Sequence, residues 1–521
     1  MEKHEIVVIG GGHNGLIMAA YLAKAGLDVC VVEMRDKCGG AILTEELTVP
    51  GFKQDPFSAD HGQLQANPLI RFDELGLKSK YGLKYVTYSP GNAFIFPDER
   101  ALVVYGDVDK TCESISQFSM RDAEAYPKFL KACEGMSGIL SNMFSPPPPF
   151  GTMISFLESS EVGREYLRLM MLSALDVAED WFESEQMKSA LVRSVSEILI
   201  PPQYKGTGNF VFKFAASGTV VVPVGGSGVL VDKLEACFRD NGGTIRLSSP
   251  VKSIKVEAGK AEGVVLNTGE EILATKATIS TINVKHLFLD MLRPEEMPPG
   301  FPEKIKRIRQ SVFVTMKQDI ALNEALQYKA GGDVDKTAYV RIMLSMEDML
   351  RMFEEFSYGI PQTRDMGMAE LTLADPTRAP EGKHTLLVWQ DEPYNLKEGG
   401  PAKWDEIKQE IVDGGLETIQ KHTKNLTSEN ILGRFVRTPL DLERYNPTWI
   451  GGDAQQMALL LPQFFANRPI TGWANYRTPV KNLYMCGACT HPGPGVFGSS
   501  RAAVPVIMED LGINFKKVIA K

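Results

Sequence analysis

Three glycines near the start of the chain have the spacing of a turn that binds a dinucleotide. The run GGGHNG lies between an apolar segment over residues 4–9 and an Ala/Leu-rich segment that ends near residue 24. In such a run the first glycine permits a tight turn, the second lets the backbone approach a pyrophosphate, and the third lets the helix pack on the strand. The residues expected around the phosphates are Gly10, Gly12, His13, Asn14 and Gly15.

An acidic residue at the end of the next apolar run completes this pattern. Glu33 follows residues 29–32 and can accept hydrogen bonds from ribose hydroxyls. The segment after Glu33 contains two further glycines that bring the chain back close to the cofactor. The long FAD molecule requires this second approach of the chain, whereas a simple NAD site does not. The residues expected there are Met34, Arg35, Gly39, Gly40 and Ala41. The sequence therefore predicts FAD as the cofactor.

A parallel sheet is needed to position these loops. Residues 4–33 have the pattern of one strand–helix–strand unit, whose two strands are apolar on both faces and so predict helices on each side of the sheet. From residue 244 to 280, short β runs separated by turn signals predict a β-meander. Helical patterns cover residues 161–175 and 345–356.

A second glycine-rich run lies near the C-terminus, CGACTHPGPGV at residues 486–496. Together with the N-terminal motif and VPVGGSG at residues 222–228, it resembles the phytoene desaturase-like superfamily of FAD-dependent oxidoreductases, which includes phytoene dehydrogenases, carotenoid isomerases and amine oxidases. Within that superfamily the chain looks most like the branch named pyridine nucleotide-disulfide oxidoreductase domain-containing protein 2. The resemblance covers nearly the whole chain.

The resemblance implies roles for residues outside the N-terminal motif. Gly487 and Ala488 are expected near the pyrophosphate or the ribityl chain, and the backbone of Val251 is expected to contact the adenine. The residues expected near the isoalloxazine ring are Gly493, Gly495 and Val496.

The expected fold class is α/β, with a Rossmann-type FAD-binding domain of the glutathione reductase kind interleaved with an α+β substrate domain. The FAD-binding domain is expected to be discontinuous and to comprise residues 1–75, 220–290 and 475–521. The substrate-binding domain is expected to comprise residues 76–219 and 291–474.

Three residues are candidates for catalysis, each with a plainer alternative. His61 follows the first FAD segment at a place that faces the flavin in relatives, or it hydrogen-bonds backbone or lies at the surface. His491 belongs to the C-terminal motif, or it shapes the turn before Pro492. Arg477 precedes the last FAD strand and could stabilise cofactor or substrate, or it is an ordinary surface or packing arginine.

Cys486 and Cys489 form a C-x-x-C pair inside the predicted FAD loop. The pair has no second pair and no histidine cluster at ligand spacing beside it, so the sequence predicts no metal site. Coincidence is the favoured interpretation of the spacing, while a dithiol that exchanges electrons with the flavin stays open.

The resemblance implies hydride transfer to the flavin from a small hydrophobic substrate, isoprenoid or alicyclic, in a desaturation. The Met-, Leu- and Phe-rich blocks at 110–220 and 290–470 would line an apolar cavity, or they form an ordinary core. Double-bond isomerisation, amine oxidation and a structural role for bound FAD are the alternatives. Reoxidation is expected to use oxygen, a quinone or a redox protein.

Composition limits the partners. The net charge of −9 comes without a basic cluster, which argues against nucleic acid. Seven scattered cysteines fit a reducing compartment, and no signal peptide or long apolar run is seen, so a cytoplasmic location is expected. The run Pro146–Pro149 has two interpretations, a rigid surface connector or, with Phe144, Phe150 and Met153, a loop that docks on a membrane or closes over the substrate entrance. Because of the second interpretation, peripheral membrane contact stays open.

Overall fold

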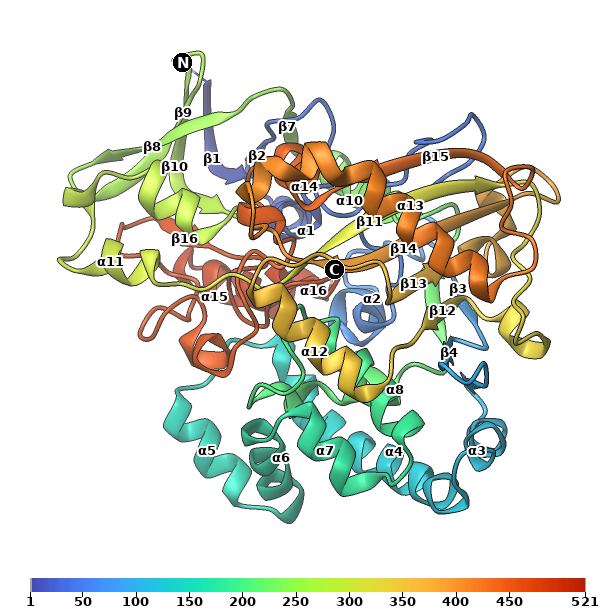
Figure 1. The fold of residues 1–521 in the computed structure, drawn as a ribbon. Coiled ribbons are helices and arrows are strands. Elements are labelled where there is room, and N and C mark those ends of the chain that lie inside the picture. Colours follow the sequence, from blue (N-terminus) through green and yellow to red (C-terminus); the bar gives the residue numbers. More distant parts are fainter. Residues whose placement is uncertain (1, 521) are drawn as a thin grey trace.

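The computed structural model describes residues 2–520, except for the side chains of residues 136–142. Two seven-stranded sheets dominate it (Figure 1). The N-terminal segment predicted as strand, helix and strand forms β1 (Glu2–Ile9), α1 (His13–Lys24) and β2 (Val29–Val32). The predicted α/β fold class is confirmed.

The first sheet has the strand order β7-β2-β1-β10-β9-β8, and β16 pairs with β10. Five of its strands are mutually parallel neighbours, and β8, β9 and the first half of β10 form the predicted antiparallel meander. The remaining strands of this sheet are β7 (Thr244–Arg246), β8 (Val251–Glu257), β9 (Lys260–Leu266), β10 (Glu271–Ser280) and β16 (Leu483–Met485).

Strand β1 is buried on both faces, as its apolar run predicts. Ile6 and Val8 pack in a core with helices α1, α10 and α15, whereas Val7 and Ile9 pack in another core with the meander and the segment around Phe288. On the first of these faces, α1, α10 (Gly228–Asp240) and α15 (Ser500–Asp510) each begin after a glycine-rich loop. The short α16 (Phe515–Ile519) packs against the same core.

The second sheet has the order β15-β11-β14-β13-β12-β4-β5 and is mostly antiparallel. A two-stranded ribbon of β3 (Tyr85–Tyr88) and β6 (Val220–Pro223) lies outside both large sheets. The strands of the second sheet are β4 (Asn92–Ile95), β5 (Ala101–Val104), β11 (Val314–Leu322), β12 (Tyr339–Ile342), β13 (Met366–Ala369), β14 (His384–Glu392) and β15 (Ile431–Arg437).

A helical block forms the lower part of the molecule in Figure 1. The predicted helix over 161–175 is divided in two, because Ser173 caps a new helix through a reciprocal capping box with Asp176. The helices of this block are α3 (Val108–Ser116), α4 (Met120–Leu140), α5 (Phe150–Glu158), α6 (Glu161–Met171), α7 (Ala174–Trp181), α8 (Glu185–Ser196) and α9 (Phe212–Ala215).

The remaining helices connect strands. The predicted helix over 345–356 is α12 (Met346–Ser357), capped by the Ser345 side chain. The others are α2 (Pro68–Arg71), α11 (Phe301–Lys306), α13 (Trp404–His422) and α14 (Pro439–Tyr445). The domain boundaries drawn from the sequence stay a prediction.

The four-proline run precedes α5 without forming a helix itself. Phe144 and Met153 beside the run are buried, and Phe150 is 46% exposed. Of these three apolar side chains, Phe150 is therefore the one that is accessible to another molecule or a membrane surface. No helix over residues 2–520 is both long and apolar enough to cross a membrane. Peripheral membrane contact stays a prediction.

Candidate FAD and substrate site

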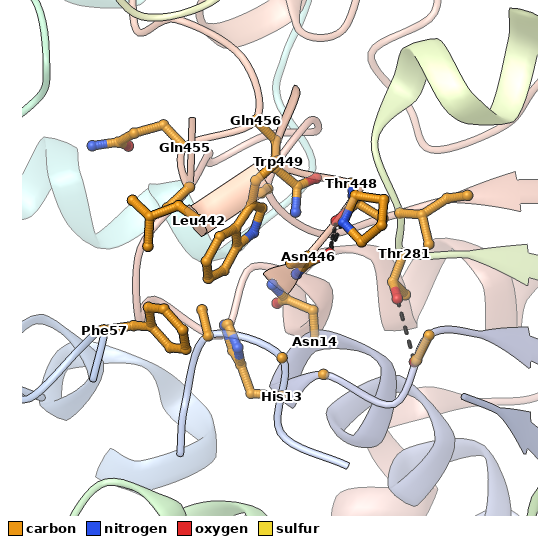
Figure 2. A pocket seen from close by; sticks show the side chains of 18 of the residues that line it. His13, Asn14, Phe57, Thr281, Leu442, Asn446, Thr448, Trp449, Gln455 and Gln456 are labelled. Carbon is orange, nitrogen blue, oxygen red and sulfur yellow. Dashed lines mark hydrogen bonds between the residues drawn. The ribbon is translucent and has the colours of Figure 1, made fainter. Parts of the chain in front are cut away.

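One cavity of about 640 Å³ extends from the N-terminal glycine loop to the second sheet. Figure 2 shows His13 and Asn14 on one side of it, with Leu442, Thr448 and Trp449 facing them from the other side. The cavity thus joins the loop that was predicted to bind a dinucleotide to side chains from the opposite part of the fold.

The glycine loop fits the role that its spacing predicts. Gly10 has φ +98°, which favours glycine, and α1 begins at His13 directly after Gly12. A Cβ on Gly15 would lie 1.9 Å from the carbonyl oxygen of Gly10, so only glycine allows this approach of helix and strand. The backbone N–H of Gly39 donates to the Gly11 carbonyl at 3.0 Å, which holds the second glycine pair against the loop.

Glu33 lies at the end of β2 and lines the cavity with a side chain that is 7% exposed. Its carboxylate accepts hydrogen bonds from the backbone N–H groups of Gly11 at 2.7 Å and Arg35 at 2.9 Å. These bonds fix the carboxylate beside the loop. The position is the one from which an acid can accept bonds from ribose hydroxyls.

Thirteen of the seventeen predicted cofactor residues line this cavity. They are Gly10, Gly12, His13, Asn14, Glu33, Met34, Arg35, Gly40, Ala41, Val251, Ala488, Gly495 and Val496. The other four, Gly15, Gly39, Gly487 and Gly493, are not wall residues. Gly487, for example, has φ +108° and a Cβ on it would lie 3.6 Å from the Cβ of Asn14, so it packs behind the loop.

Among the three candidate catalytic residues, none lines the cavity. His61 is fully buried, its Nδ1 lies 3.3 Å from the Tyr85 hydroxyl, and its backbone N–H donates to Val221. Burial lowers the pKa of His61 to about 3 and that of His491 to about 4, so both rings are neutral. The buried ring of His61 contacts a tyrosine hydroxyl, which is neither of the alternatives given for it, and the catalytic roles of both histidines stay predictions.

Arg477 is a surface residue in the structure. Its guanidinium is 45% exposed and donates to both carboxylate oxygens of Asp510, at 2.8 and 2.7 Å. A side chain held in this pair outside the cavity fits the surface alternative given for Arg477, and its catalytic role stays a prediction.

Cys486 and Cys489 are buried free thiols. The Ser500 hydroxyl lies 3.2 Å from the sulfur of Cys486, and the Val284 N–H lies 3.5 Å from that of Cys489. Burial raises the pKa of Cys486 to about 12 and that of Cys489 to about 11, which keeps both thiols protonated at neutral pH. Neither thiol lines the cavity, so the geometry favours the coincidental interpretation of the C-x-x-C spacing.

The far wall of the cavity was missed by the sequence reasoning. It comes from adjacent strands of the second sheet, with Thr315 and Lys317 on β11 and Trp389 and Asp391 on β14. Alternate residues on a strand point to the same face of the sheet, and this two-residue period is the signal in the sequence that could have grouped these wall residues. The period does not say which face of the sheet meets the cavity. Glu197, the C-cap of α8, extends this wall.

The carboxylates in this wall are backed by buried arginines. The fully buried Arg193 donates to Asp391 at 2.7 Å and to Asp365 at 2.8 Å, and Arg341 lies 3.6 Å from Glu197. Burial raises the pKa of Asp391, and the charge of Arg193 opposes that shift. The wall therefore holds fixed charges beside its aromatic groups.

Residues 439–456, which we call the strap, close the side of the cavity that faces the glycine loop. The Nδ2 of the buried Asn283 donates to the carbonyls of Thr448 and Gln456, each at 3.1 Å, and His286 Nε2 contacts the carbonyl of Pro447 at 2.8 Å. Within the strap, Trp449 packs edge-on against Phe57 at 4.8 Å between ring centroids.

The Met-, Leu- and Phe-rich blocks at 110–220 and 290–470 contribute part of the cavity wall, with Leu199 from the first block and Leu442 from the second, but their Met- and Phe-rich helix α12 does not line it. Met349, Met352, Phe353 and Phe356 of α12 are buried in the core of the helical block, and none of them is a wall residue. Their alternation with acidic positions makes one helix face apolar, which a helix needs for any core. The plain alternative, an ordinary core, describes them correctly.

Comparison with known proteins assigns the fold to a family. A family model described as "Flavin containing amine oxidoreductase" matches residues 15–413, well over half of the chain. The chain belongs to this family. FAD is therefore its cofactor, and the chain is an FAD-dependent oxidoreductase.

Individual relatives agree with the predicted superfamily. The chain is 30% identical to the rat protein "Pyridine nucleotide-disulfide oxidoreductase domain-containing protein 2", over 98% of this chain and 94% of the relative. It is 27% identical to one of the subunits of a limonene dehydrogenase from Castellaniella defragrans, over 99% of this chain and 96% of the relative. Phytoene desaturases are also among its relatives. The predicted resemblance is confirmed.

A solved putrescine oxidase variant shares the fold. The two structures superpose with a TM-score of 0.63 over 100% of this chain and 99% of the other, at 13% sequence identity. At this identity the likeness concerns the fold alone.

The residues around the glycine loop fit FAD on grounds of shape and polarity. His13, at the start of α1, has an Nε2 that is buried without a hydrogen-bond partner among the described residues, and Figure 2 shows its ring at the cavity beside Phe57. Burial lowers the pKa of His13 to about 4, so its ring is a neutral hydrogen-bonding group. Backbone at a helix start and a fixed carboxylate are groups that bind a dinucleotide, and the neutral imidazole adds a free hydrogen-bonding atom beside them.

Proposed function

We propose that this oxidoreductase dehydrogenates a hydrophobic substrate, forming a double bond by loss of a hydride to the flavin and of a proton to the protein. The observation that carries the proposal is the single cavity that joins the glycine loop to an aromatic wall. Phe57, Trp389 and Trp449 supply the aromatic faces of that wall, and Leu199 and Leu442 add aliphatic surface.

The chain's own residues have separate roles in this proposal. Glu33 and the glycine loop would hold the FAD, which when bound supplies the hydride acceptor. The aromatic residues would bind the apolar part of the substrate, since ring faces bury large area with few rotatable bonds. The strap, held by Asn283, would keep water from the reacting carbon.

The names of two kinds of relative support a desaturation. One relative belongs to a limonene dehydrogenase and others are phytoene desaturases, so apolar isoprenoid substrates occur in proteins of similar sequence. Lys317, Glu197 and Asp391 add polar positions that a purely hydrocarbon site does not need. We therefore expect a substrate that is apolar over most of its length and carries one polar group.

Amine oxidation is the second candidate, and the same wall favours it. The fold brings the aromatic residues Phe57, Trp389 and Trp449 into the cavity from segments that lie far apart in the sequence. Aromatic faces beside the carboxylates of Glu197 and Asp391 also suit an ammonium group. Isomerisation and a structural role for FAD are distinguished from both candidates by whether a compound reduces the flavin.

The test is the visible spectrum of the flavin-loaded protein under nitrogen. Limonene, linear isoprenoids that carry a polar end group, cyclohexylamine and putrescine are added separately, followed by air or a soluble quinone. Bleaching by an isoprenoid and recovery with an acceptor support the proposal and identify the reoxidant, which we expect to be oxygen, a quinone or a redox protein. Bleaching by amines alone favours the second candidate, and a flavin that no compound bleaches contradicts both.

A further inference from the structure

Three side chains with different metal-binding groups meet where the first sheet begins, outside the cavity. Glu2 and His4 lie two positions apart on β1, and Cys30 lies on the neighbouring strand β2. A Glu2 carboxylate oxygen, a His4 ring nitrogen and the Cys30 sulfur all lie within 4.8 Å of one another. In Figure 1, β1 begins in the upper part of the molecule, and the cavity wall contains none of these three residues.

A β-bulge in β1 brings the three side chains to one face of the sheet. The backbone N–H groups of Glu5 and Ile6 both donate to the carbonyl of Asp28, each at 3.0 Å, so two residues of β1 stand opposite one residue of its neighbour. Ile6 packs in one core and Cys30 in another, on opposite faces of the sheet. Strict alternation would place His4 on the face of Ile6, and the extra residue turns it to the face of Cys30.

The ring of His4 is held in the way that metal-bound histidines are held. Its Nδ1 lies 2.8 Å from Asp28 Oδ1, and its Nε2 lies 3.0 Å from Glu2 Oε1. A histidine that binds a metal almost always donates its other ring N–H to a carboxylate, carbonyl or water, which fixes the tautomer and directs the free nitrogen to the ion. The plain alternative is a protonated ring that donates to both carboxylates.

The Cys30 thiol distinguishes these two interpretations. Cys30 is fully buried, and among the described residues its sulfur makes one weak hydrogen bond, to the adjoining Val31 carbonyl at 3.9 Å. A hydrogen-bonded histidine with two carboxylates needs no thiol beside it. A sulfur that lies next to an imidazole and a carboxylate, without a strong partner of its own, is a ligand for a soft divalent cation.

The charges around the cluster favour a cation. Arg246 of β7 contacts Glu2 and also pairs with Glu270 at 3.0 Å. The carboxylates of Glu2, Asp28 and Glu270 thus surround one guanidinium, which leaves an excess of two negative charges while the His4 ring is neutral. A divalent cation balances this excess.

We propose that Glu2, His4 and Cys30 bind a zinc ion and that Asp28 is the positioning residue that orients His4. Thiolate, imidazole and carboxylate together are ligands for Zn²⁺, whereas Mg²⁺ and Ca²⁺ bind oxygen ligands. The Cys30 thiol gives its proton to solvent as the bond between zinc and sulfur forms. Water completes the tetrahedral shell, since the Glu2 side chain is 27% exposed.

The ion joins β1 to β2 at the end of these strands that lies away from the glycine loop, and so stabilises the sheet that carries the FAD site. The sequence predicts no metal site, because a bulge and a contact between two strands produce no ligand spacing that can be recognised. This inference goes beyond the proposed function and does not depend on the substrate.

The test uses the flavin-loaded protein, which is treated with a chelator and then titrated with Co²⁺ as a coloured probe of the zinc site. Tetrahedral Co²⁺ with a thiolate ligand has intense d–d bands at longer wavelengths than oxidised flavin absorbs. We expect about one equivalent of Co²⁺ per chain to produce these bands, and about one equivalent of Zn²⁺ to remove them. Zn²⁺ should also raise the melting temperature while flavin content stays unchanged.

Variants assign the ligands. Cys30→Ser should abolish the bands and, like His4→Gln, weaken Zn²⁺ binding at least about a hundredfold, and His4→Gln serves alone if the buried serine prevents folding. Asp28→Asn should weaken binding by about ten- to a hundredfold with little change in the melting temperature of the metal-free protein. Cys237→Ser in α10 is the matched control, because Cys237 is also a buried free thiol, and its bands should match those of the wild type.

The outcomes separate this inference from the proposed function, because metal binding is measured without substrate. Failure of every compound in the substrate panel to bleach the flavin leaves the expected cobalt bands in place. Absence of the bands at one equivalent of Co²⁺, or bands that persist in Cys30→Ser, would overturn the inference. Zn²⁺ binding of unchanged strength in His4→Gln would also overturn it, and the cluster would then be a hydrogen-bonded group around a protonated His4.

Discussion

The two ends of the cavity are built in different ways. At the cofactor end, the glycine loop and Glu33 come from the 24 consecutive residues from Gly10 to Glu33, and backbone groups form most of the surface that would meet the cofactor. At the substrate end, side chains arrive from α8, β11, β14 and the strap, which are far apart in sequence. The turn that binds a pyrophosphate is one local geometry used by many proteins, whereas a substrate wall is assembled from whatever segments the fold brings together.

The largest effect is expected at the cofactor end, from Gly15→Ala. Its Cβ would lie 1.9 Å from the Gly10 carbonyl oxygen, so helix α1 has to move away from the loop. We expect FAD binding to weaken at least about a hundredfold, measured as flavin content and by fluorescence titration of the apoprotein. Gly151→Ala in α5 is the control, because the described residues leave the space around that Cβ open within 4 Å. Equal flavin content in the two variants would contradict this assignment of the loop.

A smaller loss is expected for Glu33→Ala. The carboxylate orders the loop through Gly11 and Arg35 and would bind the ribose, and a hydrogen bond to a charged group contributes about 1.5–3 kcal/mol. The dissociation constant for FAD should rise by about ten- to a hundredfold. Full retention of flavin at dilute concentration would exclude Glu33 from the site.

These two residues also show what sequence could predict. The turn, the acid and the meander follow from local spacing and alternation: β1 begins two residues before the expected run, α1 ends at the expected residue 24, and β8–β10 lie within the expected span 244–280. Lys317 and Trp389 have no such signal, because their function depends on which face of β11 and β14 meets the cavity. For the same reason the sequence left two interpretations of Arg477 open, since nearness in sequence to a FAD strand says nothing about the direction of a side chain.

At the substrate end, Glu197→Gln should separate the two functions of the cavity. The residue lines the wall beside Arg341 and its side chain is 41% exposed, so loss of its charge should leave FAD bound. For a compound that bleaches the flavin, we expect KM to change by about three- to tenfold with flavin content unchanged. A loss of flavin as large as that of Glu33→Ala would mean that the two ends are not separate.

A still smaller effect is expected for Arg477→Ala, outside both ends. The exposed pair with Asp510 contributes little, so flavin content and bleaching rate should stay within about twofold and the melting temperature should fall by a few degrees at most. A tenfold fall in bleaching rate at normal flavin content would restore a catalytic role.

The smallest effect concerns Cys486 and Cys489. Both thiols are buried with raised pKa values, so a thiol reagent at about pH 8 should modify neither of them until the protein is unfolded in urea. Mass spectrometry of peptides identifies the modified residues, and the partly exposed Cys112 is the internal positive control. Rapid modification of Cys489 in the folded protein would reopen a redox role for the pair.

The central claim is that one cavity holds FAD at the glycine loop and presents its reactive ring to the wall of the second sheet. A crystal structure of the flavin-loaded protein tests it most directly. We expect the ribose beside Glu33, the pyrophosphate at the start of α1, and the isoalloxazine between Gly495 and the wall that contains Lys317 and Trp389. FAD bound outside this cavity, or with its ring turned away from β11 and β14, would contradict the claim.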